Sequence, residues 1–243
     1  MHMRLLFVVV LLGLTMAFAE SEWKLLYFYE EKVPSTSIPK EFAQPFELIL
    51  TNAIKKLGNQ CLVLVDRKQV KTPYLTASGV FIKNNSNLFA VVTDLCRDTT
   101  QDQSNDIYII GFFESLRIKN YVVFKKSKAS YITSMRDFFG VKDINSNGID
   151  ELALVINDGD GCCGITTLYL FENIPSMKCI SSFIVERTSN FSQSVYITKL
   201  FVKKSKTLTY MADVKEVDGK IEKIRRDVPI LPQNCSKSIT FLR

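Results

Sequence analysis

Hydrophobic positions recur through most of the chain in short runs separated by turn-forming residues, a pattern typical of β-strands. Two of the separators, Asn84 to Asn87 and Asp218-Gly219, have the composition of hairpin turns. Such frequent turns favour antiparallel pairing between neighbouring strands. The predicted strands are Glu22–Glu31, Cys61–Asp66, Tyr74–Lys83, Leu88–Thr93, Asp106–Phe113, Arg117–Lys125, Glu151–Asn157, Thr166–Glu172, Cys179–Glu186, Ser194–Lys203, Leu208–Val217 and Lys220–Asp227.

One segment near the N-terminus has a different period. Val33 to Gln44 contains prolines and is predicted to be a connecting loop. Apolar residues then recur at helical spacing, and Gly58 stands where a helix commonly ends. The predicted fold is therefore mainly β, with antiparallel sheets arranged as propeller-like blades or as a sandwich, and one N-terminal amphipathic helix. The apolar positions of that helix are Phe46, Ile49, Leu50, Ala53, Ile54 and Leu57.

The first residues have the three-part pattern of a secretory signal. A short basic start precedes an apolar run, and Ala17-Phe18-Ala19 places small residues where a signal peptidase reads. A retained anchor is the alternative, but the run is shorter than the roughly 20 residues that cross a bilayer. We predict cleavage after Ala19, a single mainly-β domain over 20–243 without a transmembrane segment, and a secreted or periplasmic location.

The chemistry available to the mature chain is limited by its lack of histidine. His2 is the one histidine in the chain and lies within the predicted signal. Its loss excludes Ser-His-Asp and Cys-His nucleophile systems and His-ligated zinc. The chain is 47% hydrophobic, enough to fill a core, and no acidic pair stands out as an acid/base couple. These observations favour a protein that is not an enzyme.

Six cysteines lie beyond the predicted signal. In an oxidising compartment an even number indicates disulfide bonds, although sequence does not determine their pairing. We predict two bridges: Cys61 with Cys96, and Cys179 with one member of the Cys162-Cys163 pair. The alternative is that some are buried thiols. The C-terminal segment that carries Cys235 is expected to lie over the domain and to be linked to it.

The segment from residue 143 to 151 carries the motif with the clearest chemical rationale. Oxygen-bearing side chains at alternate positions let a curled loop point several ligands inward, and Gly148 permits the sharp turn. Calcium takes about six to eight oxygen ligands, so water would complete the shell. Asp150 is expected to point toward solvent, and a turn without metal is the alternative. The predicted calcium ligands are the side chains of Asp143, Asn145, Asn147 and Glu151 and the carbonyl oxygen of Ile149.

With Phe139-Gly140 before it and an apolar strand after it, this segment resembles a single FG-GAP (VCBS-type) unit of integrin-like β-propellers. The resemblance covers residues 139–172, and the sequence contains no second copy. In that family the loop binds a structural calcium ion, which implies the same five ligands here. The family usually has acids at loop positions 5 and 9, where this chain has Asn147 and Glu151. Fewer charges predict weak binding, with a dissociation constant of about 10⁻⁴–10⁻³ M.

Two further segments have simpler interpretations. The sequence KKSK occurs at 125–128 and at 203–206, and we interpret both copies as solvated hairpin turns. A basic surface for anionic glycans, lipids or nucleic acid is the alternative, but a net charge of +6 is modest and predicts no specific nucleic-acid partner. The acidic, glycine-rich stretch 157–164 is interpreted as a hairpin tip pinned by a disulfide, or else as a source of one more carboxylate for the ion site.

Together these patterns predict an exported, non-catalytic β-domain with a weak structural calcium loop. Its partner is expected to be a protein or glycan at the cell envelope. The alternative is a carboxylate-dependent hydrolase acting on envelope polysaccharide, which two facing carboxylates in a deep cleft would favour.

Overall fold

The computed structural model describes residues 23–29, 39–58, 74–82, 87–98, 105–127, 132–159, 163–172, 177–189, 192–204, 207–235 and 238–242. Within these ranges one helix, α2 (Lys40–Leu57), accompanies a series of antiparallel strands. The strands are β1 (Trp23–Phe28), β2 (Tyr74–Gly79), β3 (Leu88–Asp98), β4 (Asn105–Glu114), β5 (Arg117–Lys126), β6 (Ile132–Val141), β7 (Glu151–Gly159), β8 (Gly164–Glu172), β9 (Lys178–Ser189), β10 (Gln193–Lys204), β11 (Leu208–Asp218), β12 (Ile221–Ile230) and β13 (Ile239–Leu242).

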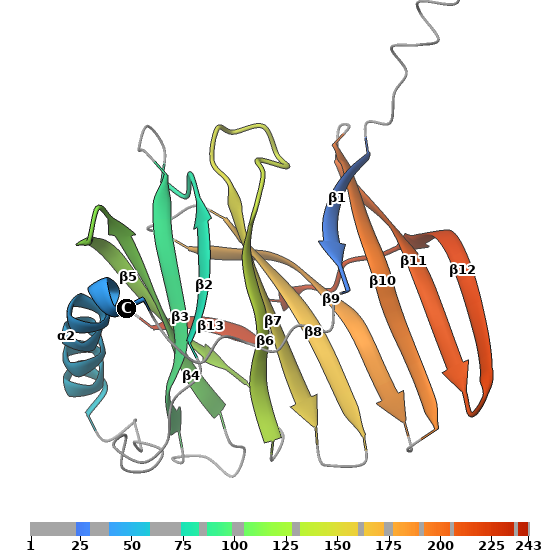
Figure 1. Ribbon diagram of the computed structural model, residues 1–243, viewed down its shortest axis with the longest axis horizontal. Helices are drawn as coiled ribbons and strands as arrows, with labels where there is room; N and C mark the ends of the chain where they lie inside the picture. The colour runs from blue at the N-terminus through green and yellow to red at the C-terminus, as the bar shows by residue number, and fades with distance from the viewer. Residues whose placement is uncertain are drawn as a thin grey trace, which may run out of the picture.

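The strands form two sheets, which confirms the predicted mainly β, antiparallel fold with one helix. The large sheet has the order β12-β11-β10-β9-β8-β7-β6, and β1 joins it by pairing with β10 (Figure 1). The small sheet has the order β13-β5-β4-β3-β2. The two sheets face each other across a shared core, as in the sandwich alternative.

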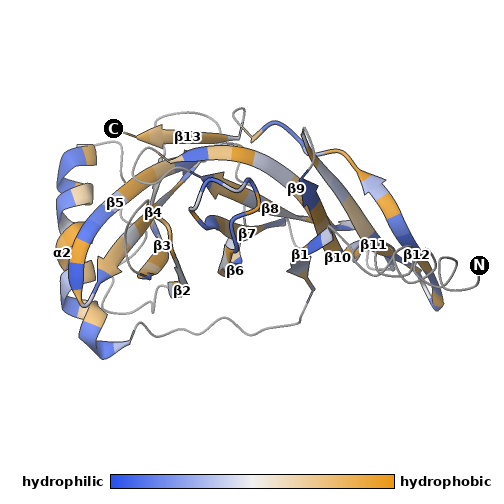
Figure 2. Cartoon of the chain, turned by 90° about the horizontal axis from the view of Figure 1, so that it is seen from above, coloured by the Kyte–Doolittle hydropathy of each residue, from blue (hydrophilic) through white to orange (hydrophobic). Residues whose placement is uncertain are grey.

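Apolar side chains form three layers of core. The central layer lies between the sheets and includes the fully buried Phe81, Phe112 and Phe171. A second layer lies between α2 and the other face of the small sheet, and Figure 2 shows α2 at one end of the molecule with β12 at the other. The third layer lies on the opposite face of the large sheet, and β1, which is paired with β10, contributes Leu26 and Tyr27 to it.

The helix forms where its apolar spacing predicts, and it ends at Gly58, whose backbone has a φ of 55°. Its buried residues are Phe46, Ile49, Leu50 and Ala53. The predicted loop is wrong for residues 40–44, because the helix begins at Lys40, directly after Pro39, whose carbonyl oxygen accepts a hydrogen bond from the Phe42 N–H at 2.9 Å.

Strand β6 was not predicted from the hydrophobic pattern, because charged residues interrupt it. Arg136 lies within the strand, donates a hydrogen bond to the hydroxyl of Tyr29 at 2.7 Å and forms an ion pair with Glu186. Its guanidinium also lies 4.8 Å from the centre of the Tyr29 ring. A paired arginine can therefore occupy a sheet position that its charge alone would assign to solvent.

The C-terminal segment is linked to the domain as expected, but by a different bond from the one predicted. Cys235 forms a disulfide with Cys179, at a Cα–Cα distance of 6.0 Å. The predicted bridge from Cys179 to the Cys162-Cys163 pair is therefore wrong. Cys61 lies outside the described residues, and so does the side chain of Cys96, so their pairing stays a prediction. Beyond Cys235 the chain continues as β13 and pairs with β5.

The first KKSK segment is not a solvated hairpin turn, because β5 and the following β6 lie in different sheets. Lys126 in this segment is only 2% exposed. Its ammonium group lies 2.6 Å from the carboxylate of Asp158, which also accepts a hydrogen bond from the hydroxyl of Thr133 at 3.2 Å. In the second segment, Lys203 and Lys204 are the described residues; they end β10 and pair with Thr209 and Leu208 of β11, as the hairpin interpretation predicts.

Candidate functional site: the loop between β6 and β7

The predicted calcium loop joins two neighbouring strands of the large sheet. Val141 at the end of β6 lies opposite Glu151 at the start of β7. Within the loop, Ser146 and Gly148 have φ angles of 59° and 82°. A Cβ atom on Gly148 would meet no atom within 4 Å, so the backbone angle rather than crowding calls for glycine there. The loop thus makes the tight turn that its sequence predicts.

The polar side chains at alternate loop positions turn back onto the loop's own backbone. The two carboxylate oxygens of Asp143 accept hydrogen bonds from the N–H groups of Asn147 and Gly148, each at 2.9 Å. The side-chain oxygen of Asn145 accepts from the same Asn147 N–H at 3.1 Å, and that of Asn147 accepts from the Ile149 N–H at 2.8 Å. The three predicted side-chain ligands of the first half of the loop are therefore brought together on its inner side.

Glu151 lies beneath the loop and is only 1% exposed. One carboxylate oxygen, Oε2, accepts a hydrogen bond from the Ile144 N–H at 2.9 Å, so the carboxylate points toward the beginning of the loop. The other oxygen, Oε1, is buried and has no hydrogen-bond partner. An ionised carboxylate with an unsatisfied buried oxygen is costly, and a cation bound at this oxygen would remove that cost.

The electrostatic surroundings of Glu151 agree with this geometry. Burial raises the pKa of Glu151 from its ordinary 4.5 to about 7, against hydrogen bonds from the N–H groups of Ile144 and of Glu151 itself, which lower it. The negative charges of Asp143 and Glu172 contribute to the same rise of the pKa. The charges of Asp143 and Glu172 thus act on Glu151 at this end of β7, where a nearby positive charge would offset them.

Glu172 was not among the predicted site residues. It ends β8, and the Asn145 side-chain amide donates a hydrogen bond to its carboxylate at 2.9 Å. The β7–β8 pairing ends with Leu152 opposite Phe171, and continuing the same register by one residue would set Glu151 opposite Glu172. The strands predicted at Glu151–Asn157 and Thr166–Glu172 form a hairpin. Pairing them along their full length in the sequence analysis would have brought Glu172 next to Glu151.

Asp150 does not point toward solvent as expected; it is only 6% exposed. One oxygen of its carboxylate accepts a hydrogen bond from the Val80 N–H at 2.9 Å, and the other accepts from the Asp143 N–H at 3.2 Å. Lys142 lies 3.1 Å from it. Burial alone would raise the pKa of Asp150, but these three donors together lower it below its ordinary value. Asp150 therefore fastens the loop to the end of β2 rather than facing water.

Two lysines from other strands donate hydrogen bonds to backbone carbonyl oxygens of the loop. Lys24 in β1 donates a hydrogen bond to the carbonyl oxygen of Asp143 at 3.0 Å, and Lys204 in β10 donates to the carbonyl oxygen of Asn145. Neither carbonyl belongs to the predicted ligand set. Their positive charges lie close to the loop, and they weaken the attraction of its carboxylates for a cation.

The predicted ligand set contains only two carboxylates. In the part of the chain that the structure describes, no group of three or more His, Cys, Asp or Glu residues is arranged to hold a metal ion. Amide and backbone oxygens would have to complete the shell, which suits calcium better than a transition metal. Calcium is therefore the cation that the chemistry of these oxygen donors would suit.

The described part of the acidic stretch after β7 does not contribute to this site. Asp158 lies at the far end of β7 from Glu151 and is engaged by Lys126 and Thr133. Gly159 pairs with Gly164, so the described ends of this stretch form a hairpin ladder, as interpreted. The predicted pin to Cys179 is absent because that cysteine is bonded to Cys235.

Two surface cavities give no support to the hydrolase alternative. One lies under the C-terminal segment and is lined by residues such as Met177, Ile180 and Phe241. The other lies beside α2, where Glu47 is its acidic lining residue. Neither presents the two facing carboxylates that glycoside hydrolysis requires.

Comparison of the chain with known protein families, curated proteins and solved structures gives no significant match. The fold and the loop therefore define the class: a two-sheet antiparallel β-protein with one helix, a disulfide that fastens its C-terminal segment, and an oxygen-rich loop between adjacent strands. Among the described residues, no helix combines the length and the apolar character needed to cross a bilayer.

Proposed function

We propose that the protein is an exported, non-catalytic β-domain in which residues 143–151 bind a structural calcium ion, and that it serves as a binding module for a protein or glycan at the cell envelope. The observation that carries the proposal is the buried Oε1 atom of Glu151, which has no hydrogen-bond partner beneath a loop whose side-chain oxygens turn inward. The resemblance to FG-GAP units and the predicted signal support it from the sequence.

The position of the loop indicates what such an ion would do. Asp150 connects the loop to the end of β2 in the small sheet, Lys24 connects it to β1, and Lys204 connects it to β10. An ion held by Asp143 and Glu151 would fix the loop to which these three contacts attach. Its role is to stabilise the assembly of both sheets, and it supplies no reaction chemistry.

A melting curve with and without calcium tests the proposal. With a dissociation constant of about 0.5 mM, 5 mM calcium stabilises the folded protein by about 1.4 kcal/mol. For a chain of this size, the melting temperature should rise by about 3–5 °C and return to its starting value in chelator. Asp143→Ala should abolish the rise.

The matched control is Asp218→Ala, which removes an exposed carboxylate from the hairpin between β11 and β12 and should leave the calcium response intact. A wild-type protein that melts at the same temperature in millimolar calcium and in chelator would refute the calcium assignment.

A further inference from the structure

The outer face of β1, β10 and β11 carries a patch of apolar side chains. Leu200, Val202, Tyr210 and Ala212 point into the core, so the residues between them point outward. Phe201 lies opposite Leu25 on one side and Met211 on the other, which places three side chains in a row across three strands. Trp23 and Phe28 lie on the same face of β1, because a register shift between Leu25 and Tyr27 interrupts the regular alternation of the strand. We call Trp23, Leu25, Phe28, Phe201 and Met211 the outer patch.

The outer patch is accessible. Leu25 is 55% exposed and Phe28 is 47% exposed, while Trp23, Phe201 and Met211 are half-buried. The opposite face of the same strands is buried in the core, so the fold does not need these outer side chains to be apolar. A contiguous exposed apolar patch of this kind is typical of an interaction surface.

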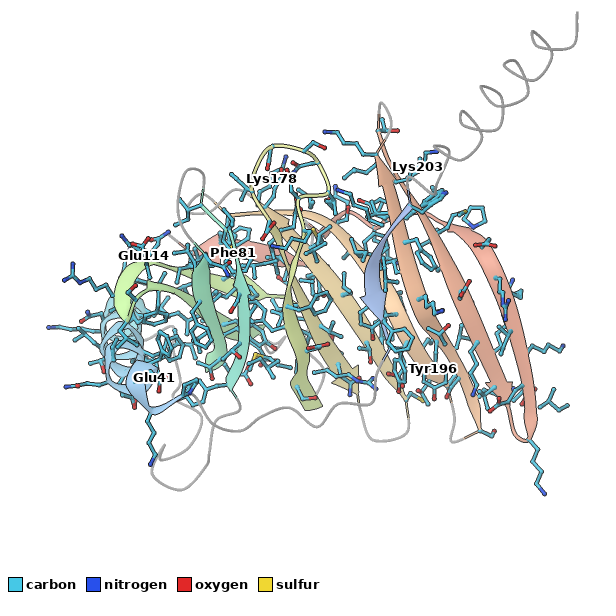
Figure 3. All side chains as sticks on the ribbon, turned by 45° about the horizontal axis from the view of Figure 1, so that its top comes forward. Glu41, Phe81, Glu114, Lys178, Tyr196 and Lys203 are labelled. Atoms are coloured by element: carbon cyan, nitrogen blue, oxygen red, sulfur yellow. A yellow bond between two sulfur atoms is a disulfide. The ribbon has the colours of Figure 1, made fainter. Side chains whose placement is uncertain are left out.

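Lysines flank the patch at both ends. In β10, Lys199 and Lys203 are two residues before and after Phe201 and therefore share its face. Lys203 lies opposite Trp23, and Lys199 lies opposite Phe28 (Figure 3 labels Lys203 near the start of β1). Among the residues paired with these lysines across the strands, the acidic one is Asp213, which lies opposite Lys199. The surface thus combines apolar side chains with a basic rim.

This combination favours a lipid surface over the other partners. Leu25, Phe28 and Met211 have no hydrogen-bonding side-chain groups, so the hydroxyls of a glycan would find partners at the lysine rim and none over the centre of the patch. The patch lies along the face of a sheet, whereas protein interfaces are dominated by anchor side chains that enter pockets. A bilayer needs no such pocket. Aromatic and aliphatic side chains enter the headgroup region of a bilayer, and lysines beside them attract anionic headgroups.

We propose that the outer patch docks the protein on an anionic lipid surface, with Leu25 and Phe28 entering the headgroup layer and Lys199 and Lys203 contacting lipid phosphates. This binding is peripheral and does not require the calcium loop, which lies at the β6–β7 connection. The two proposals can therefore fail separately.

Co-sedimentation of the exported, oxidised protein with phosphatidylcholine vesicles, with and without phosphatidylglycerol, tests the proposal. Binding should require phosphatidylglycerol and weaken in high salt. Leu25→Ser combined with Phe28→Ser should reduce the partition constant at least about ten-fold. Lys199→Gln and Lys203→Gln should each reduce it about five-fold. The measurements are made in chelator, so that calcium binding has no influence on them.

The matched control is Ile221→Ser combined with Ile224→Ser, which removes two exposed apolar side chains from β12 outside the patch and should leave vesicle binding unchanged. Three outcomes would overturn the proposal: no binding to anionic vesicles, binding that the patch variants do not alter, or a dimer in light scattering that the Leu25 and Phe28 changes dissociate. The last outcome would make the patch a protein interface.

Discussion

Asp150 and Val80 are joined by a reciprocal pair of hydrogen bonds. The Asp150 N–H donates to the Val80 carbonyl oxygen at 2.8 Å, and the Val80 N–H donates to the Asp150 carboxylate at 2.9 Å. Val80 directly follows β2 in the small sheet, and Asp150 directly precedes β7 in the large sheet. These bonds therefore tie the two sheets together at the edge of the candidate calcium loop.

The backbone is also closely packed at this junction. A Cβ atom on Gly140 would lie 2.6 Å from the carbonyl oxygen of Ser78, so glycine allows β6 to approach β2. The neighbouring Phe81 is completely buried between the sheets (labelled in Figure 3). Movement of the loop is thus coupled to the docking of β2 on the large sheet.

Replacing Asp150 should therefore destabilise the whole protein and not only the loop. Asp150→Ala leaves the Val80 and Asp143 N–H groups without their acceptor, and we expect the free energy of unfolding to fall by about 2–3 kcal/mol. Urea denaturation measures this loss. Hydrogen exchange at the Val80 amide should accelerate as well. Asp218→Ala is the exposed control and should change stability by less than about 0.5 kcal/mol. Equal effects of the two substitutions would contradict the tie between the sheets.

The sequence predicted the local features of this region and missed the long-range ones. The turn at Gly148 and the inward side chains of Asp143 and Asn147 follow from residue type and spacing over a few positions. The partners Lys24 and Lys204 are 119 and 59 residues away from the loop carbonyls that they contact. No local pattern contains that information, because it depends on how β1 and β10 are placed against β6.

The cysteine pairing and strand β6 also depend on contacts between residues far apart in the sequence, which local patterns do not reveal. The partner of Cys179 is 56 residues away, and the sequence offered nearer candidates of equal chemistry. In β6, the charge of Arg136 interrupts the alternation of apolar and polar residues by which a strand is recognised. The fold tolerates this charge because Arg136 forms an ion pair with Glu186 of β9. By contrast, α2 and most of the strands follow from hydrophobic period alone.

The disulfide between Cys179 and Cys235 should contribute substantially to stability. It closes a sequence separation of 56 residues and fixes the segment leading to β13, which completes the edge of the small sheet. We expect Cys235→Ser to reduce the free energy of unfolding by about 2–4 kcal/mol and to expose the C-terminal segment to proteases. Cys163→Ser is the matched control, because Cys163 takes no part in this bridge. If both variants melt alike, the bridge does not have this role.

The packing of α2 can be tested on two faces of the same helix. Phe46 is 1% exposed and contacts Tyr74 and Phe113 of the small sheet, whereas Leu48 is 58% exposed. We expect Phe46→Ala to cost about 3–5 kcal/mol and Leu48→Ala to cost less than about 0.5 kcal/mol. Thermal denaturation followed by circular dichroism compares the two. A small loss for Phe46→Ala would mean that the helix does not pack on the small sheet as described.

The sharpest test of the calcium loop is Glu151→Gln, because the stability that this substitution adds should shrink when calcium is present. An acid whose pKa is raised on folding stabilises the folded state most below its unfolded pKa of 4.5, and that stability is lost as the pH rises through about 7. In chelator at pH 8, wild-type protein carries this penalty of roughly 3 kcal/mol. Glutamine has the same shape and no charge, so the variant should be the more stable protein under these conditions.

In millimolar calcium the difference in stability between the variant and the wild-type protein should narrow, because an ion bound at the Glu151 carboxylate stabilises the wild-type protein and has no equivalent ligand in the variant. Urea denaturation from pH 4 to pH 8, with calcium and with chelator, gives four curves for comparison. The variant should show a flatter pH dependence and no calcium response. A variant that is less stable than wild type in chelator at pH 8 would show that the buried carboxylate is satisfied without a cation, and the structural role of calcium would then lose its physical basis.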